Sequence, residues 1–113
     1  MSVLMKNEQM LAGLVPSDSG WQTTTAVNGN TLKYRKIGNQ VWLKKGTAGT
    51  LTAGAWNTVA NLPDGFRPAT NLVDCTYYKL PTYQTVLILS TGAVQIVADT
   101  ASIYDFCISF LVD

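Results

Sequence analysis

Histidine is absent from this chain of 113 residues, which removes the commonest general base and the commonest zinc ligand. The two cysteines, Cys75 and Cys107, lie too far apart in sequence to replace it. The aspartates are single and scattered without a glycosidase motif, although the sequence leaves open a pairing in space. Glycine-rich phosphate-binding motifs are also missing. We therefore expect a protein that is not an enzyme and that uses no cofactor or metal.

Charged side chains are scarce as well. They make up 13% of the residues, against 47% hydrophobic residues, and the formal net charge is +1. This charge argues against nucleic-acid binding, and the cations that crowd residues 33–45 are typical of a solvated strand edge. The chain lacks both the apolar run of about 18 residues that a membrane-spanning helix needs and the order of a secretory signal. So little charge indicates that another subunit covers part of the surface.

Apolar and β-branched runs, separated by turn signals such as Gly38-Asn39 and Thr91-Gly92, are the main feature that is present. Short strands at this spacing are typical of an antiparallel β-sandwich or jelly roll. We therefore predict one all-β domain over residues 21–113 with about eight strands: Trp21–Val27, Thr31–Ile37, Gln40–Lys45, Asn57–Leu62, Asn71–Lys79, Thr85–Ser90, Ala93–Ala98 and Tyr104–Val112.

The alternation of apolar with other residues within these runs indicates which residues form the core. Every second residue gives a consistent apolar face at Val41, Leu43, Val86, Ile88, Val94, Ile96, Phe106, Ile108 and Phe110. Several residues between them are apolar too: Leu87, Leu89, Val97, Cys107 and Leu111. Because an antiparallel sandwich has two outer faces, we expect a neighbouring subunit to cover these positions.

Two segments fall outside the strand pattern. In residues 1–20, apolar residues recur at helical intervals up to Leu14, and Pro16 to Gly20 reads as a linker. We predict a short helix or stem segment there, with a frayed terminus as the alternative. Residues 46–54 are rich in Gly, Thr and Ala, which predicts a flexible exposed loop or a ragged edge.

Four sequence segments carry a resemblance to a known family. They are "YRKIGNQVWLKKG" from Tyr34, "W..VANLPDGFRP" from Trp56, "TGAVQIV" from Thr91 and "ISFLVD" at the end of the chain. In order and spacing they resemble the C-terminal head domain of tail-fibre and baseplate receptor-binding proteins of phages and prophages of Gram-positive bacteria. The resemblance runs from about Trp21 to Asp113. The long fibrous stem common in that group is missing, which leaves open an excised head or a short accessory protein.

The resemblance implies a function and an assembly. It implies a homotrimeric β-sandwich head that binds a host cell-wall saccharide or teichoic-acid-like polymer and contacts other tail or baseplate proteins. The protein would be made in the host cytoplasm and would act in the virion. A disulfide between Cys75 and Cys107 is possible, but because that cytoplasm is reducing, the resemblance favours two free buried thiols. The turn around Phe66 and Arg67 would be anchored by the burial of Phe66 and by hydrogen bonds from Arg67 to backbone carbonyls.

Loop aromatics beside polar side chains are the candidate saccharide contacts, because sugar rings stack on aromatic faces while their hydroxyls need planar polar groups. We predict a shallow site at a subunit boundary formed by Trp56, Asn57, Tyr83 and Asp105. A packing role for Trp56 is the alternative. Trp21 and Trp42 lie in predicted strands and are expected in the core or an interface.

Two other function classes compete with a receptor-binding head. One is a structural tail, baseplate or fibre domain that trimerises or docks without binding a glycan, and it would present a large apolar patch at the distal loops. The other is an enzyme acting on wall polymers, which the absent histidine and carboxylate motif argue against.

Overall fold

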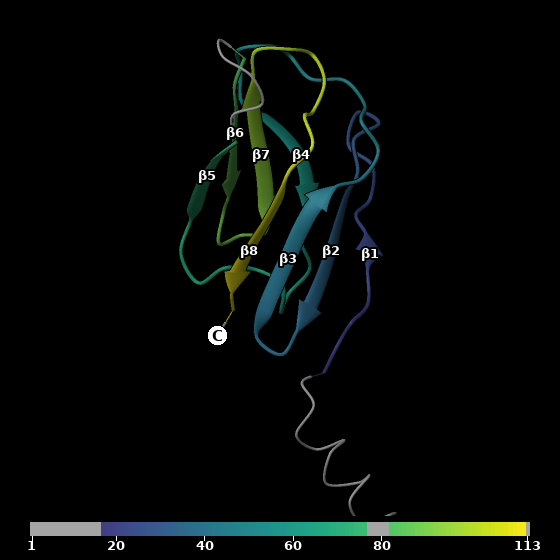
Figure 1. The fold of residues 1–113 in the computed structure, drawn as a ribbon, viewed down its shortest axis with the longest axis vertical. Coiled ribbons are helices and arrows are strands. Elements are labelled where there is room, and N and C mark those ends of the chain that lie inside the picture. The colour runs from purple at the N-terminus through teal and green to yellow at the C-terminus, as the bar shows by residue number, and fades with distance from the viewer. Residues whose placement is uncertain (1–16, 77–81, 113) are drawn as a thin grey trace, which may run out of the picture.

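Figure 1 shows the fold in a computed structural model, which describes residues 17–76 and 82–112. The described residues form eight strands and no helix, and the strands build two four-stranded antiparallel sheets that pack face to face. The predicted all-β sandwich is therefore confirmed. The helix predicted before Pro16 lies outside the described residues.

The first sheet has the strand order β1-β2-β3-β8. Strands β2 and β3 form a hairpin in which Ile37 pairs with Gln40, so Gly38 and Asn39 are the two turn residues. Gly38 has a φ of 62°, as this kind of turn requires. The bounds of the four strands are Gln22–Thr23 for β1, Leu32–Ile37 for β2, Gln40–Lys45 for β3 and Cys107–Leu111 for β8.

The second sheet has the order β4-β7-β6-β5. Strands β5, β6 and β7 are consecutive neighbours, while β4 joins the sheet at the far side of β7 through a ladder whose register shifts between Thr58 and Ala60. The bounds are Asn57–Asn61 for β4, Leu72–Thr76 for β5, Gln84–Ile88 for β6 and Ala93–Ala98 for β7. Residues 46–56 and 99–106 carry the chain between the two sheets.

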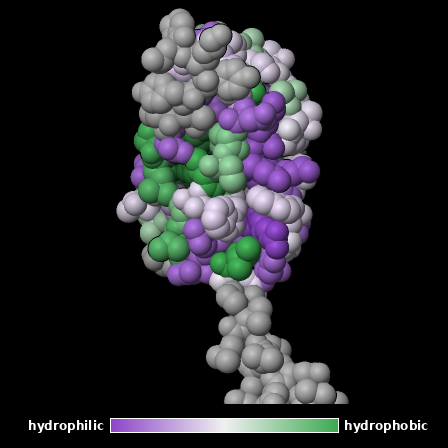
Figure 2. Space-filling view, viewed as in Figure 1, coloured by the Kyte–Doolittle hydropathy of each residue, from purple (hydrophilic) through white to green (hydrophobic). Residues whose placement is uncertain are grey.

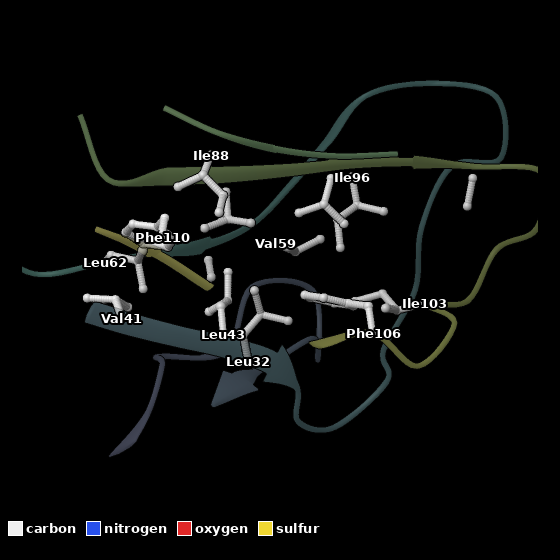
Figure 3. Packing of buried hydrophobic residues seen from close by; sticks show 14 of the residues in the cluster. Leu32, Val41, Leu43, Val59, Leu62, Ile88, Ile96, Ile103, Phe106 and Phe110 are labelled. Atoms are coloured by element: carbon white, nitrogen blue, oxygen red, sulfur yellow. The ribbon is translucent and has the colours of Figure 1, made fainter. Parts of the chain in front are cut away.

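The core lies between the inner faces of the two sheets (Figure 3). Eight of the nine predicted core residues are buried, and Ile108 is half-buried and packs against them. Alternation therefore identified the inner faces correctly, because successive strand residues point to opposite sides of a sheet. The sandwich also buries residues that alternation did not select, among them Leu32, Leu51, Val59, Leu62 and Ile103.

The outer faces carry the apolar residues that a neighbouring subunit is expected to cover. Leu87 and Val97 of the second sheet are half-buried, whereas Cys107 and Leu111 of β8 are exposed. Cys107 is a free thiol, as expected, but it is not buried, so that part of the expectation was wrong. The reason is its position on β8, where the inward residues are Ile108 and Phe110.

The loop of residues 46–54 is not a ragged edge, because a buried side chain fixes it. The Asn30 carboxamide accepts a hydrogen bond from the Gly49 N–H at 2.8 Å and donates to the Thr50 carbonyl at 3.0 Å. Asn30 is 1% exposed, and Leu51 is buried in the core. The segment is a loop with mostly exposed residues, as predicted, but composition does not reveal a long-range clamp of this kind.

The turn between β4 and β5 is anchored as predicted. The Phe66 ring packs edge-on against Tyr34 with ring centroids 5.0 Å apart. The Arg67 Nε donates to the Leu62 carbonyl at 2.8 Å, and its guanidinium pairs with Asp64. This turn therefore ties the start of the second sheet to the first sheet.

The glycine of the β6–β7 turn tests this packing. Gly92 has a φ of 96°, and a Cβ built there would lie 2.5 Å from the Leu62 carbonyl oxygen, whereas Gly54, with a φ of 74°, has open space around it. We expect Gly54→Ala to lower the free energy of unfolding by about 1–2 kcal/mol through backbone strain alone. Gly92→Ala should lower the free energy of unfolding clearly more than Gly54→Ala does. Urea denaturation of both variants measures the difference. Equal losses would show that the turn can move away from Leu62.

Candidate functional site

The four predicted site residues lie at one end of the sandwich, where three inter-strand connections meet (Figure 1). The Leu51 N–H donates to the Ala101 carbonyl at 2.9 Å, which joins the first connection to the third. The Asp99 N–H donates to the Tyr83 carbonyl at 3.3 Å, which joins the third connection to the second. We call this surface the loop end and define it by its described residues: 46–56, 82–83 and 99–106.

Two aromatic side chains of the loop end remain open to solvent. Trp56 is 50% exposed and Tyr83 is 37% exposed. Both lie directly before a strand, Trp56 before β4 and Tyr83 before β6, so the sheet beneath sets the position of each backbone. Exposed aromatic faces on a fixed backbone can stack against a sugar ring without a large loss of conformational entropy.

Asn57, the first residue of β4, holds the loop in place rather than facing a ligand. Its side-chain oxygen accepts a hydrogen bond from the Thr52 N–H at 2.9 Å. Its amide nitrogen lies 2.8 Å from the Ala55 carbonyl, 3.1 Å from that of Thr52 and 3.2 Å from that of Ile96. Because the carboxamide already meets these backbone groups, its role is to fix the turn that carries Trp56.

Asp105 is the fourth predicted site residue and has a different environment. Its carboxylate lies 3.5 Å from the Lys45 ammonium at the end of β3, and its side chain is almost fully exposed. It therefore remains accessible as a hydrogen-bond acceptor at the loop end. A negative charge at this place favours neutral or cationic ligands over phosphates.

A buried glutamine supports the loop end and was missed by the sequence analysis. Gln84, 1% exposed, accepts a hydrogen bond from the Tyr104 N–H at 2.8 Å and donates to the Tyr104 carbonyl at 3.2 Å. The Tyr104 hydroxyl in turn donates to Asp99 at 2.9 Å. Burial, and then this hydrogen bond, raise the pKa of the Tyr104 hydroxyl above its ordinary value. The available signal was a polar residue at an inward position of the β6 pattern.

A third exposed aromatic lies on the outer face of the first sheet. Trp21 is 41% exposed, so it is not in the core. The Lys44 ammonium lies 4.1 Å from the centroid of its ring and the Arg35 guanidinium 5.9 Å away. Lys44 also pairs with Lys33 across the β2–β3 ladder. Like charges opposite one another repel, so this outer face would be stabilised by an anion.

Arg35 is itself held by a carboxylate. It makes two hydrogen bonds to Asp18, one of them from Nε at 2.9 Å. The hydrogen bond from Arg35, and then that from the Gly20 N–H, lower the pKa of the Asp18 carboxyl from 3.8 to about 2. Asp18 is therefore ionised at neutral pH and fixes Arg35 beside Trp21.

A groove of about 330 Å³ with a mixed polar and apolar lining opens between β5 and β8. Its walls include Leu72 and Val73 of one sheet and Ile108 and Phe110 of the other. Figure 2 shows apolar atoms gathered beside these two strands, on the left flank of the molecule. The groove does not lie at the loop end, where the structural alternative placed its apolar patch.

The part of the chain that the structure describes contains no group of three residues suited to hold a metal ion. Within the same residues, no helix is long and apolar enough to cross a membrane. No protein-family model and no curated protein matches this chain. A functional proposal for this chain therefore depends on the surfaces described above.

The role assigned to Asn57 can be tested by comparing two asparagines of β4. Asn57→Ala should lower the free energy of unfolding by about 1–3 kcal/mol, because the backbone groups of the turn lose their partner. Asn61→Ala, at an exposed position of the same strand, should change it by less than about 0.5 kcal/mol. Urea denaturation, followed by the fluorescence of Trp56 and the other tryptophans, measures both. Similar losses for the two variants would contradict the assignment.

The Asp18–Arg35 pair predicts a pH dependence. A carboxyl whose pKa falls on folding adds stability that is fully present above its unfolded value, here 3.8, and is lost as the pH falls through about 2. Asp18→Asn should therefore be less stable than the wild type at pH 5, and the difference should shrink between about pH 4 and 2. Urea midpoints of both proteins across this range measure the effect. A difference in stability that does not change with pH would mean that the ionisation of Asp18 does not contribute to stability.

Proposed function

We propose that this protein is the head of a phage or prophage tail receptor-binding protein, which attaches to a host cell-surface saccharide without catalysis. The observation that carries the proposal is the exposure of Trp56 and Tyr83 on the firmly held loop end. The exposed aromatic faces of Trp56 and Tyr83 and the accessible carboxylate of Asp105 belong to the same loop end. Together they supply both kinds of contact that a sugar needs, a stacking surface and a hydrogen-bond acceptor.

The rest of the proposal follows the resemblance. The protein is made in the host cytoplasm, is assembled into the tail of the virion as a homotrimer beside other tail or baseplate proteins, and binds a cell-wall saccharide or teichoic-acid-like polymer. Because one shallow site gives weak binding, the attachment strength comes from several copies that engage the same polymer. This expectation needs no enzyme activity and no cofactor.

The charge of the ligand determines which surface of this head is used. A neutral saccharide fits the loop end, where the Asp105 carboxylate accepts hydrogen bonds. An anionic polymer such as a teichoic acid instead fits the outer face of the first sheet, where Lys44 lies over the Trp21 ring and pairs with Lys33 across the ladder. Binding there would weaken as salt is added, because exposed charges are screened.

Two tryptophan variants test the proposal. We expect the labelled wild-type protein to bind whole Gram-positive cells of selected strains, and free wall polysaccharide to compete. Trp56→Ala should weaken this binding by roughly tenfold, as the loss of a stacked ring of about 1.5 kcal/mol implies. Trp21→Ala removes an equally large exposed ring from another surface and serves as the matched control.

Each outcome of this experiment has a defined meaning. Loss of binding in Trp56→Ala alone supports the loop end, and loss in Trp21→Ala alone, with strong salt dependence, supports an anionic ligand on the first sheet. Binding that both variants retain contradicts both surfaces. A well-folded protein that binds no strain in a broad panel contradicts the receptor-binding proposal.

The structural alternative has an observation of its own. The groove between β5 and β8 exposes apolar side chains, which a docking or assembly domain would bury. A tail, baseplate or fibre domain that only trimerises or docks would show no binding to cells while forming a defined oligomer. The cell-binding experiment, combined with a mass measurement, therefore separates the two functions.

A further inference from the structure

The lysine and arginine side chains that the structure describes fall into two groups. Those of the first group already have an oxygen partner, which is an aspartate or, in one case, a backbone carbonyl; they are Arg35, Lys36, Lys45 and Arg67. The second group is Lys33 and Lys44, which no carboxylate contacts within residues 17–76 and 82–112. The unpaired positive charge of the described chain is therefore confined to two residues.

These two lysines lie directly opposite each other. Lys33 of β2 pairs with Lys44 of β3 in the ladder of the hairpin. Their neighbours Leu32 and Leu43 are buried in the core, so both lysines point to the outer face of the first sheet. Opposed residues have Cβ atoms about 4.5–5.5 Å apart, and like charges at this spacing are destabilising. An anion that binds between the two ammonium groups would relieve this repulsion.

Protection of a sheet edge does not explain the pair. The sequence suggested that the cations of residues 33–45 cover a solvated strand edge, but β2 and β3 are the two inner strands of the first sheet. Lys33 has Thr23 of β1 on its other side, and Lys44 has Cys107 of β8. Because a charge on an inner strand protects no open edge, the lysines need another explanation.

One lysine of the pair is held by an aromatic ring. The Lys44 ammonium lies 4.1 Å from the centroid of Trp21, a contact that limits the conformations of this side chain before any ligand binds. Arg35 lies beside the same ring at 5.9 Å, but Asp18 balances its charge. The face therefore presents two available cations and a third that a carboxylate of the same chain already occupies.

We infer that Lys33 and Lys44 bind phosphate groups of a phosphodiester-linked wall polymer, and that Asp18 keeps Arg35 out of this contact. Lysine recognises phosphate as a point charge, so the pair responds to the charges of the polymer and not to its sugars. The site is distinct from the loop end, where the Asp105 carboxylate disfavours phosphates. The identity of the polymer rests on the proposed function, whereas the lysine pair and the occupation of Arg35 by Asp18 do not.

The salt dependence of binding counts the cations in the contact. Each cation that neutralises a phosphate of a polyanion releases about one condensed counterion, so the slope of log K against log salt changes by about one. Inorganic polyphosphate is the probe, because each of its internal phosphates carries a negative charge, as a phosphodiester does. The wild-type slope should be about −2, and Lys33→Gln and Lys44→Gln should each reduce it to about −1. Lys45→Gln, the matched control, removes the same charge from a lysine that is paired with Asp105 and should leave the slope unchanged.

Asp18 provides a variant that should bind more tightly than the wild type. Asp18→Asn releases Arg35, so the slope should steepen to about −3 and the affinity for polyphosphate at low salt should rise roughly tenfold. Asp64→Asn removes the same charge from the partner of Arg67 and should change neither quantity. Circular dichroism confirms that the variants fold. A slope that both lysine variants leave unchanged, or an Asp18→Asn variant that binds no more tightly than Asp64→Asn, overturns the inference.

Purified Gram-positive cell walls identify the source of the phosphate. The wild type should bind them and should lose this binding after hydrofluoric acid has cleaved their phosphodiester bonds, and each lysine variant should bind the untreated walls roughly tenfold more weakly. Wall binding that both lysine variants retain overturns the inference but leaves the proposed function in place at the loop end. Lysine-dependent binding of polyphosphate without binding to any wall supports the lysine site and contradicts the proposed function. A single-stranded oligonucleotide with the same number of phosphates that binds more than about tenfold tighter than polyphosphate would assign the face to nucleic acid and overturn the inference.

Discussion

The packing of two inner sheet faces against each other is the constraint on which the rest of this structure depends. Each strand must point every second side chain inward, and the inward residues of β3, β6 and β7 are almost fully buried (Figure 3). Since the apolar area removed from water stabilises the fold by roughly 25 cal/mol per Å², this alternation cannot slip by one residue without losing the core. The register of every strand, and hence the direction of every loop, follows from it.

Buried polar side chains then fix the loops that the core leaves free. Asn30, Asn57 and Gln84 each bond to backbone groups of a connecting segment, and each is more than half surrounded by protein. A hydrogen bond that satisfies a buried backbone group contributes little on its own, but its loss leaves that group unpaired at a larger cost. These three residues therefore give the loop end a defined shape, which is the condition for recognition by a shallow site.

The two kinds of exposed surface have different physical consequences. Trp56 and Tyr83 present isolated aromatic faces among polar neighbours, which suits reversible contact with a sugar. Strand β8 is the last strand of the first sheet and exposes the side chains of Cys107 and Leu111, which suits burial against another chain. Because the two surfaces lie at different places on the sandwich, a contact at β8 leaves the loop end accessible.

Alternation and turn chemistry are local properties of the chain, so they were enough to predict the all-β class, most of the core and several strand bounds. The bounds of β3 and β7 agree with the prediction, and Phe66 and Arg67 anchor their turn as expected. Only the tertiary structure decided which strands lie at the sheet edges, that Cys107 is exposed, and that residues 46–54 are clamped by Asn30. These features depend on contacts between residues far apart in sequence, which a local pattern does not contain.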